Sequence, residues 1–520
     1  QVVARSWHQS AHTMWLPPLP AAIPLTDIIT QSVTPNTLCA TIGRIDRPFL
    51  QQQDSYVLEF SGQQGHAMIC GGPQTGKTTA LRTIVLALAC THTTDYLRFY
   101  ILDLSGNDLE SLSLLPHVAG VAHQHDTEKI ARIIDEVCGF IDQPEPRHTF
   151  LIVDGWHVLH GDHEDLMEKL GRIAADGLAA RVHLVLTATR WSVVRPAIRD
   201  LIPQRIETKL GEPMDSLIDR KAQLKVPALP GRGLTSSGET MLIALSAQQD
   251  VAFIARSLVA DQPPVPRLKL LPTSLMLADL PQLDPEQNSV LLGVGGPKLG
   301  AVNWDYLASQ HMVCIGSQES GKSTLISTII AGLTQIGRER ARLVVIDHRR
   351  SHLGAIDPDM LAGYSASTQE TEKLVAAMKI TLEERLPSAE VTPQQLKDRS
   401  WWTGPDIFLI VDNLDLVADM AFAPLLSVLP HARDVGLHVV ITRKSGGCVR
   451  ALFQPFLAEI KDQSPFIIVL DADKDDGPLF GVRLKPQPPG RGVMIHHGTQ
   501  QGLIQIAAAD MPEVAEAKAS

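Results

Sequence analysis

The chain has 520 residues, which is more than one hydrophobic core normally serves, so we expect two or more domains. Its 44% hydrophobic and 20% charged residues are ordinary for a globular protein, and no apolar stretch approaches the roughly 18 residues of a membrane-spanning helix. The net charge of −11 disfavours non-specific binding to DNA or anionic lipid. Six cysteines without a CxxC pair argue against a zinc site or a disulfide framework.

The first notable segment is an apolar lead-in, "WLPPLPAAIPL" (15–25). Its prolines restrict the backbone, so the segment loses little conformational entropy when it docks. An exposed apolar segment of this kind would be a liability. We therefore expect residues 15–25 to pack against a folded domain, either their own or an adjacent one.

A phosphate-binding loop is predicted next. The strand "HAMIC" (66–70) runs into "GGPQTGKT" (71–78), which fits G-x-x-x-x-G-K-[ST], and the helical segment 77–92 follows. In this motif, backbone N–H groups and the helix N-terminus surround phosphate oxygens, the lysine reaches the β- and γ-phosphates, and the hydroxyl binds Mg²⁺. The predicted ATP-binding residues are Gly71, Gly72, Pro73, Gln74, Thr75, Gly76, Lys77 and Thr78.

An aspartate at the end of a later strand completes the first candidate site. "TFLIV" (149–153) ends at Asp154, and the ends of parallel strands meet at one edge of a sheet. We predict that Asp154 binds Mg²⁺ together with Thr78, partly through water; the alternative is that it caps the next turn. In many ATP-hydrolysing motors a glutamate directly follows this strand-end aspartate and handles the attacking water. Here the residue after Asp154 is Gly155.

The same landmarks recur in the second half of the chain. "GGPQTGKT" at residue 71 returns as "GSQESGKS" at residue 316, a shift of 245, and Asp154 returns as Asp412, a shift of 258. Landmarks in the same order at a nearly constant offset indicate an internal duplication. Short apolar strands alternate with helical stretches, which predicts an α/β fold with mostly parallel sheets flanked by helices.

A proline-rich connector separates the two copies. "ADQPPVPRLKLLP" (260–272) is typical of an extended, semi-rigid linker. We place the boundary near residue 262, which gives domains 1–262 and 263–520.

The second copy repeats the candidate site with different side chains. Ser323 and Asp412 are its predicted Mg²⁺ ligands. Asn413 follows Asp412, at the position of the glutamate in other motors. Asp415 is interpreted as a helix cap. The predicted nucleotide-binding residues are Gly316, Ser317, Gln318, Glu319, Ser320, Gly321, Lys322 and Ser323.

Several polar residues near the predicted sheet ends have two interpretations each. The strand-end groups can sense the γ-phosphate or simply end a strand; they are Thr187, Thr189 and Arg190 in the first copy, and Thr442 and Arg443 in the second. His66 and His311 open matching strands, where hydrogen bonding explains them better than metal ligation. Arg232 and Arg491 lie in matching P-G-R-G turns, either beside the sheet edge or across a subunit interface.

The landmarks resemble the FtsK/SpoIIIE ATPase superfamily and, more narrowly, the second and third ATPase domains of EccC-type subunits of mycobacterial type VII (ESX) secretion systems. The resemblance rests on "MWLPPLP", the paired P-loops, "FLIVDGW", "RSWWTGPDIFLIVDN" and the P-G-R-G turns. It implies two tandem RecA-like P-loop NTPase domains that bind ATP and Mg²⁺. It also implies a cytoplasmic place at the inner face of the plasma membrane, held through the rest of the motor.

The resemblance further implies several partners. They are a membrane-anchored first ATPase domain, other secretion-complex subunits, and small helical secreted substrates of the Esx/WXG100 type that carry a C-terminal signal. No nucleic acid partner is expected, and the chain is expected to oligomerise as part of the full complex. Because the chain starts at Gln1, we interpret it as a fragment of a longer motor rather than a separate subunit.

Both copies depart from the DNA-pumping members of the superfamily, which carry Asp-Glu where this chain has Asp154-Gly155 and Asp412-Asn413. General-base assistance is worth on the order of 10²–10⁴ in rate, and neither glycine nor asparagine can take a proton. We therefore assign no catalytic residue and expect slow or no hydrolysis of bound ATP. The alternative functions are an FtsK-like DNA translocase and a nucleotide-binding assembly scaffold without motor activity.

The segment "ALFQPFLAEI" (451–460) is the candidate for binding the export signal, because its counterpart in the first copy matches it poorly. Its apolar residues have helical spacing and could form one face of a groove. The alternative is that the same face packs on its own sheet. The residues concerned are Leu452, Phe453, Phe456 and Leu457.

Overall fold

The computed structural model describes residues 16–29, 37–162, 164–284, 286–398, 400–472, 477–482 and 487–509. Contacts divide the chain into two units, Gln1–Leu268 and Lys269–Ser520, which we call the N-terminal and C-terminal units. The division lies six residues after the expected boundary at 262, because the start of the connector packs on the N-terminal unit. The Val265 N–H donates to the Pro116 carbonyl at 2.8 Å, and the Leu268 N–H donates to the Ala119 carbonyl at 2.9 Å.

The N-terminal unit is built on one ten-stranded sheet. Six strands, β8 to β5 in spatial order, run parallel, and four antiparallel strands extend the sheet beyond β8. In spatial order the strands are β2 (Gln52–Glu59), β1 (Cys39–Arg47), β10 (Thr240–Ile243), β9 (Arg232–Leu234), β8 (Gln204–Thr208), β3 (Ala67–Cys70), β7 (Val182–Ala188), β6 (His148–Asp154), β4 (Leu97–Asp103) and β5 (Val118–His123).

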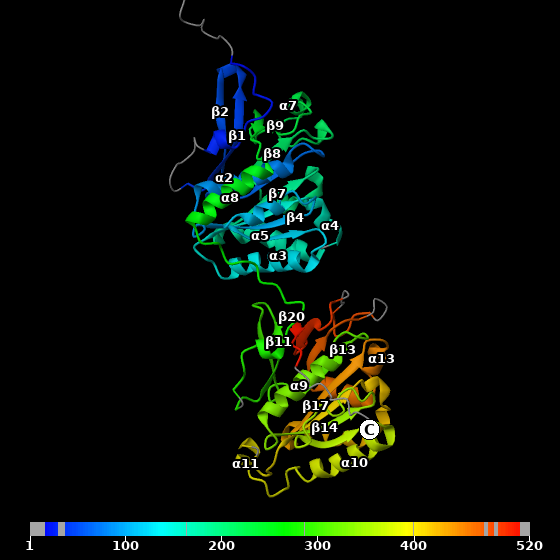
Figure 1. Ribbon diagram of the computed structural model, residues 1–520. Coiled ribbons are helices and arrows are strands. Elements are labelled where there is room, and N and C mark those ends of the chain that lie inside the picture. The colour runs from blue at the N-terminus through cyan, green and yellow to red at the C-terminus, as the bar shows by residue number, and fades with distance from the viewer. Residues whose placement is uncertain are drawn as a thin grey trace, which may run out of the picture. The chain divides into compact units, whose positions relative to one another are not determined.

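Helices cover both faces of this sheet, as the apolar sequences of the central strands require. Every residue of β4 is buried, and such strands need cover on both sides. Helices α2 (Lys77–Thr91) and α8 (Gln248–Asp261) pack on one face, and α3 (Thr127–Asp142), α4 (Trp156–Asp162) and α5 (Glu164–Asp176) pack on the other (Figure 1). The short helices are α1 (Thr26–Ile29), α6 (Pro196–Arg199) and α7 (Arg220–Lys225).

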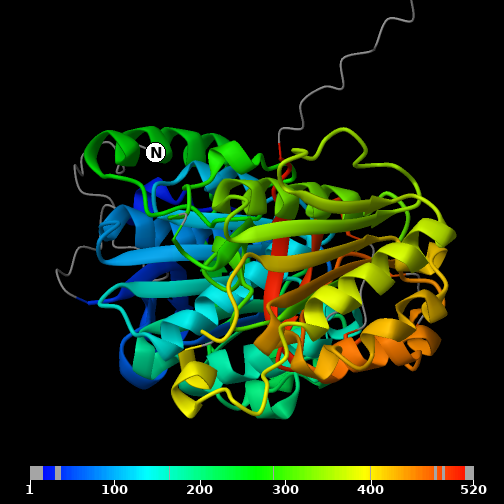
Figure 2. The ribbon, with the colours of Figure 1, turned by 90° about the horizontal axis from the view of Figure 1, so that it is seen from below.

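The C-terminal unit repeats the same strand order, and both units confirm the predicted α/β fold class. Its helix α9 (Lys322–Ile336) packs on one face of the sheet, and α10 (Thr368–Glu383) and α14 (Pro455–Asp462) pack on the other (Figure 1 and Figure 2). In spatial order its strands are β12 (Gly300–Asp305), β11 (Ser289–Gly295), β20 (Thr499–Ile506), β19 (Arg491–His496), β18 (Phe466–Val469), β13 (His311–Gly316), β17 (Leu437–Lys444), β16 (Asp406–Asp412), β14 (Ala341–Asp347) and β15 (Leu361–Ser365). The remaining helices are α11 (Pro393–Asp398), α12 (Ala432–Val435) and α13 (Cys448–Ala451).

The antiparallel extension was not predicted, and a glycine makes it possible in each unit. Both outer hairpins contain a bulge, at Thr41/Gly43 and at Leu291/Gly293. A Cβ atom on Gly43 would lie 2.1 Å from the Leu242 carbonyl oxygen, and one on Gly293 would lie 2.0 Å from the Gln505 carbonyl oxygen. Only glycine permits this approach of neighbouring backbones.

The lead-in packs on its own unit, as expected, over the residues that the structure describes (16–25). Leu19, Ile23 and Leu25 are buried. The Arg232 guanidinium donates to the carbonyls of Leu19 and Pro20 at 2.7 and 2.8 Å. Trp15 lies outside the described residues.

The same arrangement returns in the C-terminal unit. The Arg491 guanidinium donates to the carbonyls of Leu271 and Pro272 at 3.0 and 2.7 Å. The P-G-R-G arginines thus hold matching segments of their own units. These are the lead-in in the N-terminal unit and its counterpart in the C-terminal unit, residues 271–281, which we call the second lead-in.

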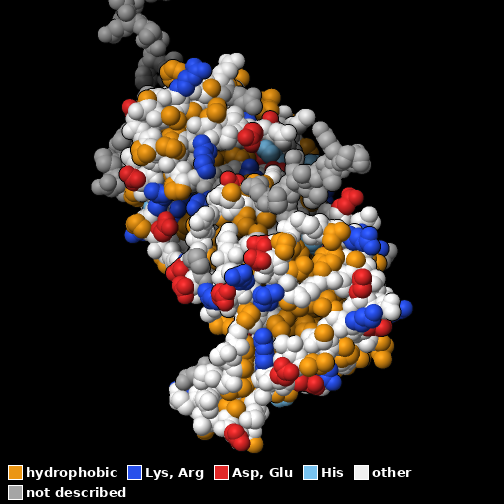
Figure 3. Space-filling model, turned by 60° about the horizontal axis from the view of Figure 1, so that its bottom comes forward, with side chains coloured by type: hydrophobic (Ala, Val, Ile, Leu, Met, Phe, Trp, Pro, Cys, Tyr) orange, Lys and Arg blue, Asp and Glu red, His pale blue; other side chains and the backbone are white. Residues whose placement is uncertain are grey.

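Surface charge is mixed on the face that Figure 3 draws, where lysine and arginine side chains are scattered among acidic ones instead of forming a stripe. Within the part of the chain that the structure describes, no helix is both long enough and apolar enough to span a bilayer.

Histidines bind the backbone where the central strands begin, opposite the edge that carries the P-loops. His66 Nδ1 accepts the Leu184 N–H at 2.9 Å, and His311 Nδ1 accepts the Val439 N–H at 3.1 Å. Hydrogen bonding at the strand entry therefore explains both residues. No cluster of metal-binding side chains occurs among the described residues.

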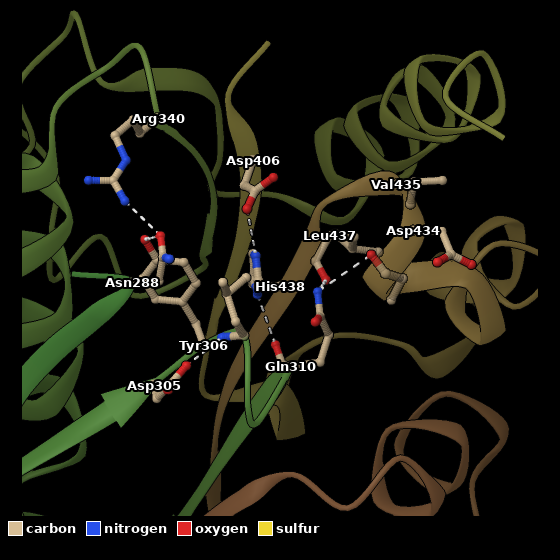
Figure 4. Close-up of polar contacts among 12 residues, drawn as sticks. Asn288, Asp305, Tyr306, Gln310, Arg340, Asp406, Asp434, Val435, Leu437 and His438 are labelled. Atoms are coloured by element: carbon tan, nitrogen blue, oxygen red, sulfur yellow. Dashed lines mark hydrogen bonds and ion pairs between the residues drawn. The ribbon is translucent and has the colours of Figure 1, made fainter. Parts of the chain in front are cut away.

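A second buried histidine in each unit has a different partner. In the N-terminal unit, His183 Nδ1 lies 2.9 Å from the Gly65 carbonyl oxygen, which can only accept, so this nitrogen carries the proton. His183 Nε2 then accepts from His148 Nδ1 at 2.9 Å, and both rings are neutral. In the C-terminal unit, His438 Nε2 lies 3.1 Å from the Asp406 carboxylate instead (Figure 4).

This difference predicts that acid destabilises the N-terminal unit more than the C-terminal unit. Burial lowers the pKa of His183 to about 3, and burial with the charges of Arg181 and His92 lowers the pKa of His148 to about 4. Between pH 6.5 and 4 the unfolded chain therefore binds protons that the folded imidazoles do not, and stability falls as the pH falls. After allowance for the exposure of His148, we expect a loss on the order of 1–2 kcal/mol. Calorimetry of the intact chain from pH 7.5 to 5 measures it.

The matched variant is His148→Asp, which gives the N-terminal unit the pairing that His438 has. We expect it to reduce the acid-induced loss, whereas the same substitution at exposed His125 leaves the loss unchanged. Equal acid sensitivity of His148→Asp and the parent chain would contradict this account.

Candidate nucleotide-binding sites

Each P-loop joins a buried strand to a helix at the carboxyl edge of its sheet. Gly76 and Gly321, the residues before α2 and α9, have φ values of 94° and 102°. A Cβ on either residue would lie 2.9 Å from the backbone nitrogen of Gly231 or Gly490, in the P-G-R-G turn. The loop glycines are therefore required by backbone packing as well as by the phosphates.

The P-loop lysines bend back over their loops. Lys77 Nζ donates to the Gly72 carbonyl at 2.6 Å, and Lys322 Nζ donates to the Ser317 carbonyl at 2.5 Å. Burial lowers the pKa of both lysines, and the carboxylates of Asp154 and Asp412 act against this shift. Phosphate oxygens would offer each ammonium group stronger acceptors at the same place.

The strand-end aspartates contact the P-loop hydroxyls, as predicted for a magnesium site. Thr78 Oγ1 donates to Asp154 Oδ2 at 2.7 Å, and Ser323 Oγ donates to Asp412 Oδ2 at 3.1 Å. Oxygen donors of this kind fit a hard divalent cation, which keeps several of its waters. The residues present therefore fit Mg²⁺, and Thr78, Asp154, Ser323 and Asp412 would hold it.

The strand-end threonines support these aspartates from the neighbouring strand. Thr187 Oγ1 donates to Asp154 Oδ1 at 2.5 Å, and Thr442 Oγ1 donates to Asp412 Oδ1 at 2.5 Å. The same hydroxyls accept the N–H groups of Gly155 and Asn413 at 2.9 and 2.8 Å. The sequence offered two interpretations of these threonines, sensing the γ-phosphate or ending a strand. The structure adds that they position the carboxylate that is predicted to bind Mg²⁺.

The backbone explains why a glutamate does not follow Asp154. Gly155 has a φ of 85°, and a Cβ there would lie 2.2 Å from the Ser105 hydroxyl oxygen. Asn413 has a φ of 59°, in a region that asparagine tolerates better than most side chains. The residue after the aspartate is left-handed in both units, which disfavours glutamate.

The C-terminal site has a buried histidine beside its aspartate. His352 Nε2 lies 3.3 Å from Asp412 Oδ2, and both side chains are almost completely buried. Burial raises the pKa of Asp412, but the neighbouring His352 ring and the hydrogen bonds from Thr442 and Ser323 outweigh burial, and the net pKa is lowered. At the position equivalent to His352 the N-terminal unit has Leu109, whose N–H binds Asp103 as the His352 N–H binds Asp347.

A cavity of about 480 Å³ opens over the C-terminal P-loop. Gln318 to Thr324 form one wall, and Thr273 to Leu275 of the second lead-in form another together with Gln505 and Ile506 of β20. The cavity therefore joins the phosphate loop to a partly apolar surface. Its remaining walls include Arg349, Ser351, Asn413, Asp415, Lys444, Pro489, Gly490 and Ala508.

Sequence reasoning missed several of these residues. Asp415 was interpreted as a helix cap, but its carboxylate accepts the Lys444 N–H at 3.1 Å and lines the cavity. Arg349 is the second residue after β14, within "IDHRR" (346–350). A cation directly after an apolar strand is the signal that could have identified it. No comparable signal marks the residues of the second lead-in.

The predicted signal-binding face is wrong in part. Phe456 and Leu457 are 0% and 1% exposed, and Phe456 stacks on Phe422 with ring centroids 4.2 Å apart. Leu452 packs against the same core, and only Phe453, at 79% exposure, faces solvent. The helical spacing reflects packing on the sheet, so this segment offers no open groove.

The fold and the two sites define a protein with two tandem P-loop nucleotide-binding domains of the RecA type. A sequence model described as "FtsK/SpoIIIE family" matches residues 33–252. The ESX secretion system protein EccC of Thermomonospora curvata is 36% identical over 95% of this chain and 42% of its own length. The ESX-4 secretion system protein EccC4 of Mycobacterium tuberculosis is 35% identical over 97% of this chain and 43% of its own length.

A solved structure agrees over its full length. The structure of Thermomonospora curvata EccC (ATPases 2 and 3) in complex with a signal sequence peptide superposes with a TM-score of 0.82 and 35% identity, covering 95% of this chain and 100% of that one. This chain belongs to the FtsK/SpoIIIE family, among the EccC-type ATPases of ESX secretion systems. It spans less than half the length of the two curated relatives above.

The left-handed backbone at residue 155 generates a prediction. Gly155→Glu adds a side chain at a positive φ, which costs about 1–2 kcal/mol, and also brings Cβ against Ser105. We expect it to destabilise the N-terminal unit by about 2 kcal/mol without raising ATP hydrolysis. Thermal unfolding and phosphate release measure the two effects.

The control is Asn413→Gly, which keeps the left-handed backbone accessible and should change stability by less than about 0.5 kcal/mol. A stable Gly155→Glu chain that hydrolyses ATP faster than the parent would contradict the steric explanation.

Proposed function

We propose that this chain is the ATP-binding, substrate-recognising part of a type VII secretion motor and that it turns ATP over slowly. The observation that carries the proposal is the pairing of Thr78 with Asp154 and of Ser323 with Asp412 beside intact P-loop lysines. These contacts supply what Mg·ATP binding needs. Neither unit places a carboxylate directly after the aspartate, so bound ATP acts mainly as a structural or regulatory ligand.

We further propose that the chain works together with other parts of a motor. On family resemblance we propose a membrane-anchored first ATPase domain as the partner that hydrolyses ATP, and a cytoplasmic position at the inner face of the membrane. Small helical Esx/WXG100-type proteins would be the exported substrates. Oligomerisation would come with assembly of the full complex.

Two other functions fit the observations less well. A DNA translocase would favour a basic track, but the chain has a net charge of −11 and scattered cations on the face in Figure 3. A scaffold with vestigial sites would have no need of the aligned lysine, hydroxyl and carboxylate groups in both units. The nucleotide-binding proposal accounts for all of them.

Nucleotide binding predicts a stability increase that each P-loop lysine controls separately. Mg·ATP at about 100 times its Kd adds about 2.7 kcal/mol to the free energy of unfolding of a unit that binds it. We expect Lys77→Ala to abolish this increase in the N-terminal unit alone and Lys322→Ala to abolish it in the C-terminal unit alone. Calorimetry with and without Mg·ATP separates the two.

Lys373→Ala, an exposed lysine on α10, is the control and should leave both increases intact. Steady-state hydrolysis at ordinary motor rates, about 1–100 per second, would contradict the slow-turnover part of the proposal.

The two sheet edges differ, and this difference supports a proposed position for an export-signal site. In the N-terminal unit the connector covers edge strand β5: Val265 is 3% exposed, and Leu268 lies over Gly120, whose Cβ position is 3.1 Å from Leu268 Cβ. Arg267 adds a hydrogen bond to the Val118 carbonyl at 2.8 Å. This edge therefore binds an apolar segment of the chain.

The equivalent strand of the C-terminal unit is β15, and Gly363 in β15 occupies the position of Gly120. No described residue of that unit takes the place of Val265 and Leu268. Leu374 of α10 lies over Gly363 instead, and Ala362 is exposed. We propose that the apolar part of a substrate signal binds along β15, as the connector binds along β5.

This placement predicts that Ala362→Arg, which fills the edge without touching the core, weakens the binding of a C-terminal signal peptide from a WXG100-type substrate. We expect a loss of about 1–3 kcal/mol in binding free energy with an unchanged melting temperature. Fluorescence anisotropy with the labelled peptide measures it.

Ala376→Arg, on the exposed side of α10, introduces the same side chain away from the edge and should leave peptide affinity unchanged. If both variants bound the peptide like the parent chain, the signal site would lie elsewhere.

A further inference from the structure

Two cations besides the P-loop lysine line the C-terminal cavity, together with the carboxylates of Glu319 and Asp415. These cations are Arg349 and Lys444, and each comes from a different strand end. Arg349 is the second residue after β14, and Lys444 is the last residue of β17. The cavity thus collects cations from three neighbouring elements on one edge of the sheet.

Both of these side chains are available to a ligand. Arg349 and Lys444 are exposed, and neither forms an ion pair with a carboxylate among the residues that the structure describes. The backbone under each is fixed, because the Arg349 N–H donates to Asp347 at 3.2 Å and the Lys444 N–H donates to Asp415 at 3.1 Å. Two cations on fixed backbone, without protein partners, are typical of an anion-binding site.

The charges lie close to the P-loop. Arg349, Asp415 and Lys444 line the same cavity as Lys322 and Ser323 of the P-loop. These groups therefore face the same space as the P-loop lysine.

The N-terminal unit has neutral or weakly basic residues at the equivalent positions. Asp103 pairs with Asp154 at the strand ends of the N-terminal unit, and Asp347 pairs with Asp412 at the strand ends of the C-terminal unit. These two pairs align the units with each other. With that register, Ser105 occupies the place of Arg349, Thr189 that of Lys444 and His157 that of Asp415. The duplication therefore preserves the P-loops but not the charges around them.

We propose that Arg349 and Lys444 bind the γ-phosphate in the C-terminal site, so that this site distinguishes ATP from ADP and the N-terminal site does so much less. The inference rests on the proposed nucleotide binding. Asp415 acts as a positioning residue, since its hydrogen bond fixes the backbone from which the Lys444 side chain extends.

The physical reason is the charge difference between the two nucleotides. The γ-phosphate adds negative charge at the end of the chain of phosphates, farthest from the base and beyond the β-phosphate that Lys322 would contact in both nucleotides. Cations beyond the loop therefore favour the triphosphate selectively. A nucleotide-dependent state of the C-terminal unit would follow, while the N-terminal unit would bind either nucleotide.

The test compares Mg·ADP with the Mg complex of a non-hydrolysable ATP analogue, by calorimetric titration of the full chain carrying Lys77→Ala. We expect Arg349→Ala and Lys444→Ala each to lower the preference for the triphosphate about tenfold, with the Kd for ADP changed by less than about twofold. Arg349→Lys keeps the charge and should keep most of the preference. Arg450→Ala removes an exposed arginine of α13, outside the cavity lining, and should change neither affinity.

Three results would overturn the inference. Unchanged preference in both alanine variants would show that the cations do not contact the γ-phosphate. A parallel loss of ADP and analogue binding would place them on the shared phosphates, and an equal effect of Arg450→Ala would assign the preference to net charge. In each case the C-terminal site still binds nucleotide, whereas the absence of any binding by the Lys77→Ala chain would contradict the proposed function as well.

Discussion

Each unit depends on one buried carboxylate that two hydroxyl groups hold. Asp154 accepts from Thr78 on the P-loop helix and from Thr187 on the neighbouring strand, and Asp412 accepts in the same way from Ser323 and Thr442. Each aspartate is only 1% exposed, so it needs these partners to offset the loss of hydration. The contacts fix three elements of the sheet edge relative to one another before any nucleotide arrives.

The same network accounts for the residue that follows each aspartate. The threonine hydroxyl also accepts the next backbone N–H, and the chain turns through a left-handed conformation there. In the N-terminal unit Ser105 occupies the space that a side chain would enter. A strong scaffold for Mg·ATP and a missing catalytic glutamate are therefore consequences of one local geometry.

Duplication has kept this geometry and changed what surrounds it. Strand order, the two P-loops and the arginines that hold the lead-ins are the same in both units. The partner of the buried histidine at the strand entry, the residue beside the predicted magnesium-binding aspartate and the charges around the site differ. The two units thus have the same architecture and different electrostatics, which allows each to respond differently to acid and to nucleotide.

The sequence by itself determined the duplication, the P-loop residues from Gly71 to Thr78 and from Gly316 to Ser323, and the strands that end at Asp154 and Asp412. These features are local, because a loop motif specifies its own backbone and an apolar strand predicts its own burial. Tertiary structure decided which distant side chains meet at the sheet edge. Thr187 and Ser105 meet at this edge in the N-terminal unit, and Arg349 and Lys444 meet at the matching edge in the C-terminal unit, only because parallel strands end together. It also decided that Phe456 is core, since helical spacing of apolar residues shows that a face is covered but not what covers it.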